Sequence, residues 1–154
     1  MREIQTAGLY IVKDSFFADY PSSSYMENKH ERRPHYYAIK DRSGLLWMVP
    51  LSTQVDKYRR LIQQSEERHG NCVYYHLAPI YGKTRAFIIC DMFPVTENYI
   101  LRPYVIGSTP YVVQNSEVRR IIREKAFIYL NMVEHGVLHS PLNILETRRR
   151  LLGK

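Results

Sequence analysis

The sequence predicts an α+β domain in which a small, curled antiparallel barrel carries inserted and C-terminal helices. Strand-like runs follow one another at short spacing, which favours antiparallel pairing over the alternating strands and helices of a parallel sheet. Apolar residues recur at helical spacing in two longer stretches. The 154 residues contain no linker and no internal repeat, so we expect a single domain over 1–154.

The first half of the chain begins with three predicted strands. Gly8 to Lys13 is rich in aromatic and β-branched residues, as strands are. Residues 18–34 are polar and contain proline and serine, so we expect a loop, and loops of this length are uncommon unless they are functional. Tyr36 to Lys40 and Leu45 to Leu51 form the next two strands, joined by the turn DRSG, which ends in Gly44.

The spacing of apolar residues changes after this hairpin. Val55, Tyr58, Leu61 and Ile62 recur at three- and four-residue intervals, which predicts an amphipathic helix that ends near Gly70. Two further strands follow, and they are expected at Cys72 to Ala78 and Arg85 to Asp91, across the turn Tyr81-Gly82-Lys83.

The last part of the chain is predicted to be irregular and then helical. Four glycine or proline residues punctuate 92–114, where we expect only a short strand near Val112. A long helix starts at Asn115 or Ser116 and ends before Gly136. A final helix is expected directly after Ser140, with Pro141 in its first turn.

The charge balance points to a polyanionic partner. Lysine and arginine number 22 against 15 acids, a net charge of +7, and such a basic balance is typical of nucleic-acid-binding proteins. The 13 tyrosines add aromatic faces on which unpaired bases can stack, although aromatic residues more often lie in the core.

Several other classes of protein are disfavoured. No apolar run of 18 residues occurs, and the first residues, MREIQTAGLYIVKDSFF, lack the pattern of a signal peptide. We therefore expect a cytoplasmic protein with no membrane contact, in which Cys72 and Cys90 are buried free thiols. The histidines lack zinc-ligand spacing, and neither a phosphate-binding P-loop nor a GxSxG elbow is present, so we expect no metal and no cofactor.

The segment RPHYYAIKDRSGLLWMVPLST, residues 33–53, suggests a site. In an antiparallel pair the start of the first strand lies beside the end of the second, so Arg33 and His35 would meet Ser52 and Thr53. The sequence TQVD from Thr53 to Asp56 also fits a capping box, which stabilises a helix by about 1 kcal/mol. The two interpretations are compatible, because a capped helix start also attracts phosphate.

RNA cleavage by attack of the ribose 2′-hydroxyl needs only such groups. One proton leaves the 2′-oxygen, another reaches the 5′-oxygen, and donors must stabilise the extra negative charge at phosphorus. Histidine, lysine, arginine and hydroxyl groups can meet these needs, and those available here are Lys29, Arg33, His35, Ser52, Thr53 and Lys57.

These residues resemble a known family. The aromatic first strand, the polar loop with Tyr25 and Lys29, the segment RPHYYAI and the segment LLWMVPLSTQVDKY are similar to the ToxN/AbiQ toxins of type III toxin–antitoxin systems, and most similar to the CptN-type branch. The resemblance implies an SH3-like barrel related to the Kid and MazF ribonucleases, decorated with extra helices.

The resemblance also implies an activity and a partner. Members of this family are sequence-preferring, metal-independent endoribonucleases that leave a 2′,3′-cyclic phosphate. A small folded antitoxin RNA, made as tandem repeats that the toxin trims, inhibits them in closed assemblies of toxin and RNA. Substrate mRNA, an antitoxin RNA and such an assembly are therefore the partners that the resemblance implies.

Individual positions carry over as follows. Ser52 and Thr53 match the hydroxyl pair of the family, and Lys57 matches the basic residue that follows it. Tyr10 and Tyr25 match aromatic residues of the first strand and of the loop. The lysine that the family has before the second strand is His35 here, so either His35 takes its role or Lys29 reaches in from the loop. Further contacts with RNA are expected from the basic residues Arg32, Arg33, Arg59, Arg60, Arg120 and Arg123.

Two rival interpretations use the same residues without catalysis. The chain could be a nucleic-acid-binding module with a basic groove, or a structural protein whose positive charge keeps it soluble. Cleavage of RNA distinguishes the endoribonuclease interpretation from both of these rivals.

Overall fold

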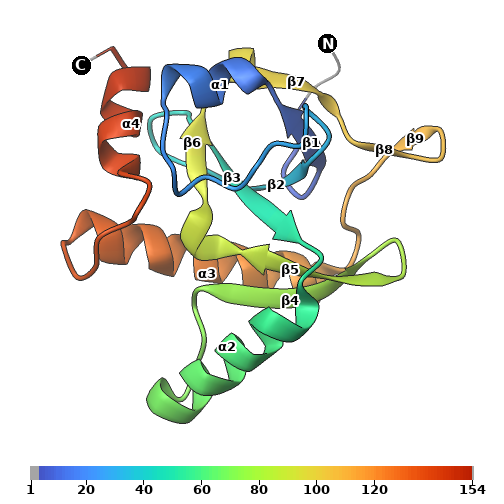
Figure 1. Ribbon diagram of the computed structural model, residues 1–154, viewed down its shortest axis with the longest axis vertical. Coiled ribbons are helices and arrows are strands. Elements are labelled where there is room, and N and C mark those ends of the chain that lie inside the picture. Colours follow the sequence, from blue (N-terminus) through green and yellow to red (C-terminus); the bar gives the residue numbers. More distant parts are fainter. Residues whose placement is uncertain (1–3, 154) are drawn as a thin grey trace.

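A computed structural model describes residues 4–153 and consists of a curled antiparallel sheet with helices packed around it (Figure 1). The predicted domain extent, 1–154, includes ends that lie outside these residues. The helices and 3-10 turns are α1 (Asp14–Asp19), α2 (Val55–His69), η1 (Ile89–Asp91), η2 (Glu97–Tyr99), α3 (Ser116–Glu134) and α4 (Ile144–Leu151). The strands are β1 (Leu9–Val12), β2 (Pro34–Lys40), β3 (Leu46–Ser52), β4 (Tyr75–Ile80), β5 (Lys83–Ile88), β6 (Phe93–Val95), β7 (Ile100–Pro103), β8 (Val105–Ile106) and β9 (Thr109–Pro110).

The main sheet has the strand order β4-β5-β3-β2-β1-β7, and β6 pairs with β3 as well. All of these pairs are antiparallel, as predicted. Because the described residues contain no pairing between β4 and β7, the sheet is open, and the predicted SH3-like barrel is not confirmed. Strand β3 is central: its first half pairs with β6, and its last two residues, Leu51 and Ser52, pair with Phe87 and Ala86 of β5.

The β2–β3 hairpin is fixed by its turn. The Asp41 carboxylate accepts hydrogen bonds from the backbone N–H groups of Ser43 and Leu45, and from the buried Trp47 indole at 2.8 Å. Gly44 completes the turn with φ 90°, a conformation that favours glycine. This turn sets the register that places His35 opposite Pro50, so the start of β2 lies beside the end of β3.

Helix α3 covers one face of the sheet and buries Ile122, Ala126 and Tyr129 against it (Figure 1). It begins as predicted, because the Asn115 side chain accepts hydrogen bonds from two backbone N–H groups of its first turn. Helix α2 follows β3 and ends at Gly70, also as predicted. Within residues 4–153 no helix is long and apolar enough to cross a membrane.

The structure differs from the prediction over residues 92–114 and at the start of the last helix, and helix α1 was not predicted. Residues 92–114 contain the sheet strands β6 and β7 and the small β8–β9 hairpin, whereas Val112 forms only an isolated bridge with Gly8. These strands are two to four residues long, which is too short for a recognisable alternation of apolar and polar residues. The last helix starts at Ile144 instead of near Pro141, because Asn143 adopts a left-handed conformation at φ 52°.

The two cysteines are free thiols, as predicted. Cys72 is buried, whereas Cys90 is only partly buried. Burial raises the pKa of the Cys90 thiol to about 12, so this group is protonated at neutral pH.

Candidate active site

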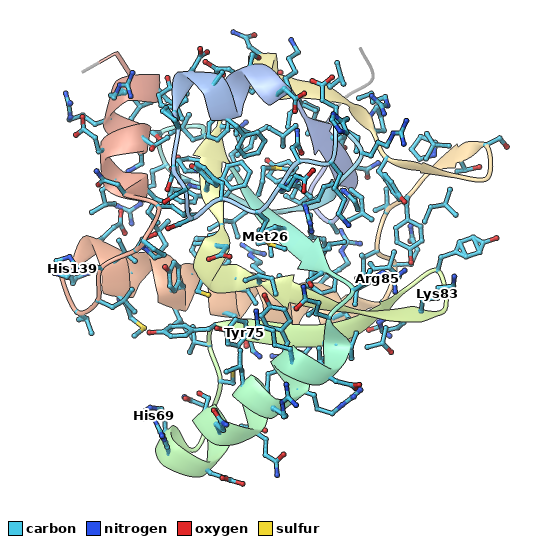
Figure 2. The ribbon with its side chains drawn as sticks, viewed as in Figure 1. Met26, His69, Tyr75, Lys83, Arg85 and His139 are labelled. Carbon is cyan, nitrogen blue, oxygen red and sulfur yellow. The ribbon has the colours of Figure 1, made fainter. Side chains whose placement is uncertain are left out.

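A cavity of about 440 Å³ opens where the end of β3 meets the loop before β2. The tip of the β4–β5 hairpin and the segment before β8 complete its walls. Figure 2 shows Met26 of the loop above β5, with Arg85 and Lys83 further along that strand towards the hairpin tip. The volume of this cavity lies within the usual range for small-molecule sites. The lining residues are Met26, Lys29, Arg32, Arg33, Pro34, Leu51, Ser52, Thr53, Gln54, Ile80, Tyr81, Lys83, Arg85, Tyr104 and Ile106.

The lining of the cavity is strongly cationic. It includes Lys29, Arg32 and Arg33 from the loop and Lys83 and Arg85 from the hairpin, and no aspartate or glutamate. A concave surface with charges of one sign raises the local concentration of ions of the opposite sign. The cavity is therefore suited to an anionic ligand.

Arg33 joins the loop to β3. Its guanidinium donates one hydrogen bond to the carbonyl oxygen of Glu27 at 2.5 Å and another to that of Leu51 at 2.6 Å. Partial burial lowers the pKa of Arg33, an effect that the nearby Glu27 carboxylate opposes. Arg33 thus holds the cationic loop against the residue that precedes Ser52, and the predicted meeting of the two segments is confirmed.

The two hydroxyl residues lie at this junction in different environments. Ser52 is 4% exposed, and its Oγ accepts a hydrogen bond from the Gln54 backbone N–H at 3.1 Å. Among the described residues no acceptor binds the Ser52 hydroxyl proton, so this proton is available to a ligand. Thr53 is exposed and also lines the cavity.

The predicted capping box at Thr53 and Asp56 is wrong. Helix α2 begins at Val55, which makes Gln54 the N-cap residue, and no side chain caps this helix. The Asp56 carboxylate instead pairs with Arg59, at 3.0 Å. A helix cap therefore does not account for Thr53, whereas the Ser52 Oγ accepts from the backbone N–H of the N-cap residue Gln54.

The rim of the cavity near Lys29 has an unusual backbone. Lys29, His30 and Glu31 all have left-handed φ values, of 51°, 57° and 62°. The neighbouring Asn28 is buried and anchors this turn by donating from Nδ2 to the carbonyl oxygen of Val12 at 2.8 Å. The Glu31 carboxylate accepts a hydrogen bond from the Asp14 backbone N–H at 2.8 Å. This anchored turn presents Lys29 to the cavity.

His35 does not reach the cavity, so its predicted place in the cleft is wrong. Its side chain is 2% exposed and packs against the rings of Phe17 and Phe93, with centroids 6.3 and 5.3 Å away. Its Nδ1 has no hydrogen-bond partner among the described residues. Burial, with a smaller contribution from the Arg33 charge, lowers the pKa of His35 to about 3, so it is neutral at pH 7.

The two predicted aromatic contacts also lie outside the cavity. Tyr10 is 4% exposed, and its hydroxyl accepts a hydrogen bond from the Gln5 backbone N–H. Tyr25 packs against Phe17 and Phe93, and burial raises the pKa of its hydroxyl well above the ordinary value. Both rings pack against the core, because every residue of β1 is buried and Tyr25 belongs to the aromatic cluster under the loop.

The predicted cations on helices are separate from the cavity lining. Lys57, Arg59 and Arg60 are exposed on α2. Arg120 forms ion pairs with glutamates on α3 and, with Arg123, borders a second cavity of about 310 Å³ on another part of the surface. These cations remain predicted RNA contacts, but they are not part of this site.

Sequence reasoning missed the wall that the β4–β5 hairpin supplies. Lys83, Arg85 and Tyr81 lie at or next to the predicted turn, so a tyrosine and two cations within five residues were the available signal. Their place beside Ser52 depends on the pairing of β3 with β5, which local patterns do not specify. Within residues 4–153 no group of three or more His, Cys, Asp or Glu side chains is placed to hold a metal ion.

Comparison with known proteins identifies a shared fold. No family model and no curated protein matches the sequence. A solved structure matches the fold with a TM-score of 0.64 over 91% of this chain and 90% of the other, at 11% sequence identity. That structure is of AbiQ, described as a lactococcal anti-phage endoribonuclease belonging to the type-III toxin-antitoxin system.

Proposed function

We propose that this protein is an endoribonuclease toxin of a type III toxin–antitoxin system. One observation carries the proposal: two hydroxyl residues and five cations line one cavity that lacks carboxylates. A phosphodiester backbone is the anion that such a cavity suits, and the fold is shared with an endoribonuclease.

The proposed reaction is cleavage by the 2′-hydroxyl without a metal ion. The 2′-oxygen forms a bond to the adjacent phosphorus and loses its proton, while the bond from phosphorus to the 5′-oxygen breaks. The 5′-oxygen gains a proton, so the products are a 2′,3′-cyclic phosphate and a 5′-hydroxyl. The protein has to neutralise the charge of the five-coordinate phosphorus and to move these protons.

The roles of the residues follow from their positions. Ser52 donates its hydroxyl proton to a non-bridging oxygen of the scissile phosphate, and Thr53 donates from the exposed side. Lys29 is the proposed group for proton transfer, because His35 is sealed in the interior. Arg32 and the hairpin cations bind the phosphates on either side.

The proposed partners are a cellular mRNA as substrate and a small antitoxin RNA as inhibitor. The antitoxin would be made as tandem repeats, trimmed by the toxin, and held with it in a closed assembly in the cytoplasm. Short tandem repeats directly upstream of the gene would support this part of the proposal, and their absence would argue against it. The biological role would be resistance to phage.

The decisive experiment is incubation of the purified protein with cellular RNA in the presence of EDTA. New fragments that end in a 2′,3′-cyclic phosphate support the proposed reaction. Intact RNA that shifts in a gel would instead identify a binding module without catalysis. Cleavage that stops when EDTA is added would overturn the metal-independent chemistry.

A further inference from the structure

Tyr81 occupies a backbone position that tyrosine rarely adopts. It forms the two-residue turn of the β4–β5 hairpin with Gly82, since Ile80 pairs with Lys83. Both turn residues are left-handed, with φ 51° for Tyr81 and 78° for Gly82. Hairpin turns of this kind favour asparagine, aspartate or glycine, because a bulky side chain is strained there. Folding alone therefore does not explain a tyrosine at this position.

The ring of Tyr81 is presented to solvent at the edge of the cationic cavity. Tyr81 is 66% exposed and lines the cavity beside Lys83 and Arg85. Among the described residues it makes no ring–ring or cation–π contact. Its backbone N–H donates to the Tyr111 hydroxyl at 3.0 Å, which fixes the turn against the segment after β9. The turn is therefore held in place while its aromatic side chain stays uncovered.

We propose that Tyr81 is a stacking platform for an unpaired nucleobase next to the phosphate held in the cavity. This inference rests on the proposed function and specifies its substrate as single-stranded RNA. Every base has an aromatic face, and stacking on tyrosine combined with cations that bind the backbone is how proteins hold single strands. A protein partner would require an apolar patch, but the residues that follow Tyr81 in the hairpin are Gly82, Lys83 and Thr84.

The substitution Tyr81→Asn tests this role without harming the fold. Asparagine is favoured in the left-handed conformation, so we expect the melting temperature of the variant to equal or exceed that of the parent. The ring-preserving substitution Tyr81→Phe is the matched control. Binding is measured with a fluorescent single-stranded 2′-O-methyl oligonucleotide, which lacks the attacking hydroxyl and stays intact. We expect Tyr81→Asn to weaken binding roughly 5- to 150-fold and Tyr81→Phe to bind like the parent.

Two further measurements separate stacking from charge. The dependence of binding on salt should be unchanged in Tyr81→Asn, because no cation is removed. A series of oligonucleotides, each with one abasic site at a different position, should locate the stacked base. The parent and Tyr81→Asn should bind with equal affinity only to the oligonucleotide that lacks this base.

The possible failures are distinguishable. If the parent binds and cleaves RNA but Tyr81→Asn binds equally tightly, the stacking role is overturned and the proposed function stands. If Tyr81→Phe loses as much affinity as Tyr81→Asn, the hydroxyl and not the ring makes the contact, which also overturns stacking. A parent protein that neither binds nor cleaves single-stranded RNA overturns both proposals.

Discussion

The adjacent residues Arg32 and Arg33 should fail in different ways when each is replaced by methionine. Arg33 donates to the carbonyl oxygens of Glu27 and Leu51, and a hydrogen bond from a charged donor contributes about 1.5–3 kcal/mol. Because the guanidinium is partly desolvated, part of this gain is offset. We therefore expect Arg33→Met to lower the free energy of unfolding by about 2–3 kcal/mol, and the melting temperature by roughly 5–10 °C in a domain of this size.

Arg32→Met removes the same charge from the next residue and is the matched control. Arg32 is exposed, and its side chain forms no hydrogen bond or ion pair within residues 4–153. We expect its melting temperature to change by less than about 2 °C. RNA affinity should fall, and the slope of log affinity against log salt should decrease by about 0.7, as for one lost phosphate contact. Equal melting temperatures for the two variants would refute the assignment of Arg33 as the link between loop and strand.

Two more substitutions test the site, and a third tests the buried His35. Ser52→Ala should reduce the cleavage rate by about 10²–10³-fold with RNA affinity retained, as for the loss of one donor to a developing oxyanion; full cleavage would remove Ser52 from the site. Lys29→Asn keeps a residue that tolerates the left-handed turn, so single-turnover cleavage should fall without loss of thermal stability. An unchanged single-turnover cleavage rate in Lys29→Asn would show that Lys29 does not transfer the proton. His35→Phe should keep RNA cleavage and flatten the decline of stability in acid. The pKa of His35 is about 3 in the folded protein and about 6.5 when unfolded, so it stabilises the fold above pH 6.5, and about 2–3 kcal/mol of this is lost by pH 4.5. Urea unfolding from pH 7 to 4.5 measures this loss, and an unchanged decline in the variant would contradict it. Burial and the nearby Lys125 charge lower the pKa of His76 to about 4, and this histidine contributes equally to the decline of both proteins.

The meeting of Arg33 with Ser52 could be predicted because it depends on local signals. The turn DRSG fixes the hairpin, and pairing in register then brings the start of β2 beside the end of β3. The same reasoning wrongly placed His35, which lies in the same strand, in the cavity. The register alone does not specify which face of the curled sheet is covered, and here α1 and β6 supply Phe17 and Phe93 to cover this side chain.

The hairpin wall could not be predicted for a different reason. Lys83 and Arg85 are more than thirty residues from Ser52, and only the pairing of Ser52 with Ala86 brings them to the cavity. Which strands become neighbours in a sheet depends on the packing of the whole domain, and a local sequence pattern carries little information about it. The open edge of the sheet was missed for the same reason.

The burial of His35 has a consequence for how the cavity can accelerate cleavage. With that histidine neutral and sealed, the polar side chains that line the cavity are hydroxyl groups, cations and the Gln54 amide. Such a set neutralises charge at phosphorus and positions the strand, and both effects depend on cations from two segments that only the folded sheet brings together. The cation–phosphate attraction weakens as salt accumulates around both partners. Added salt should therefore slow cleavage by weakening the binding of RNA. The cleavage rate of the bound complex, plotted against pH, should show no change near neutral pH that is due to the titration of His35.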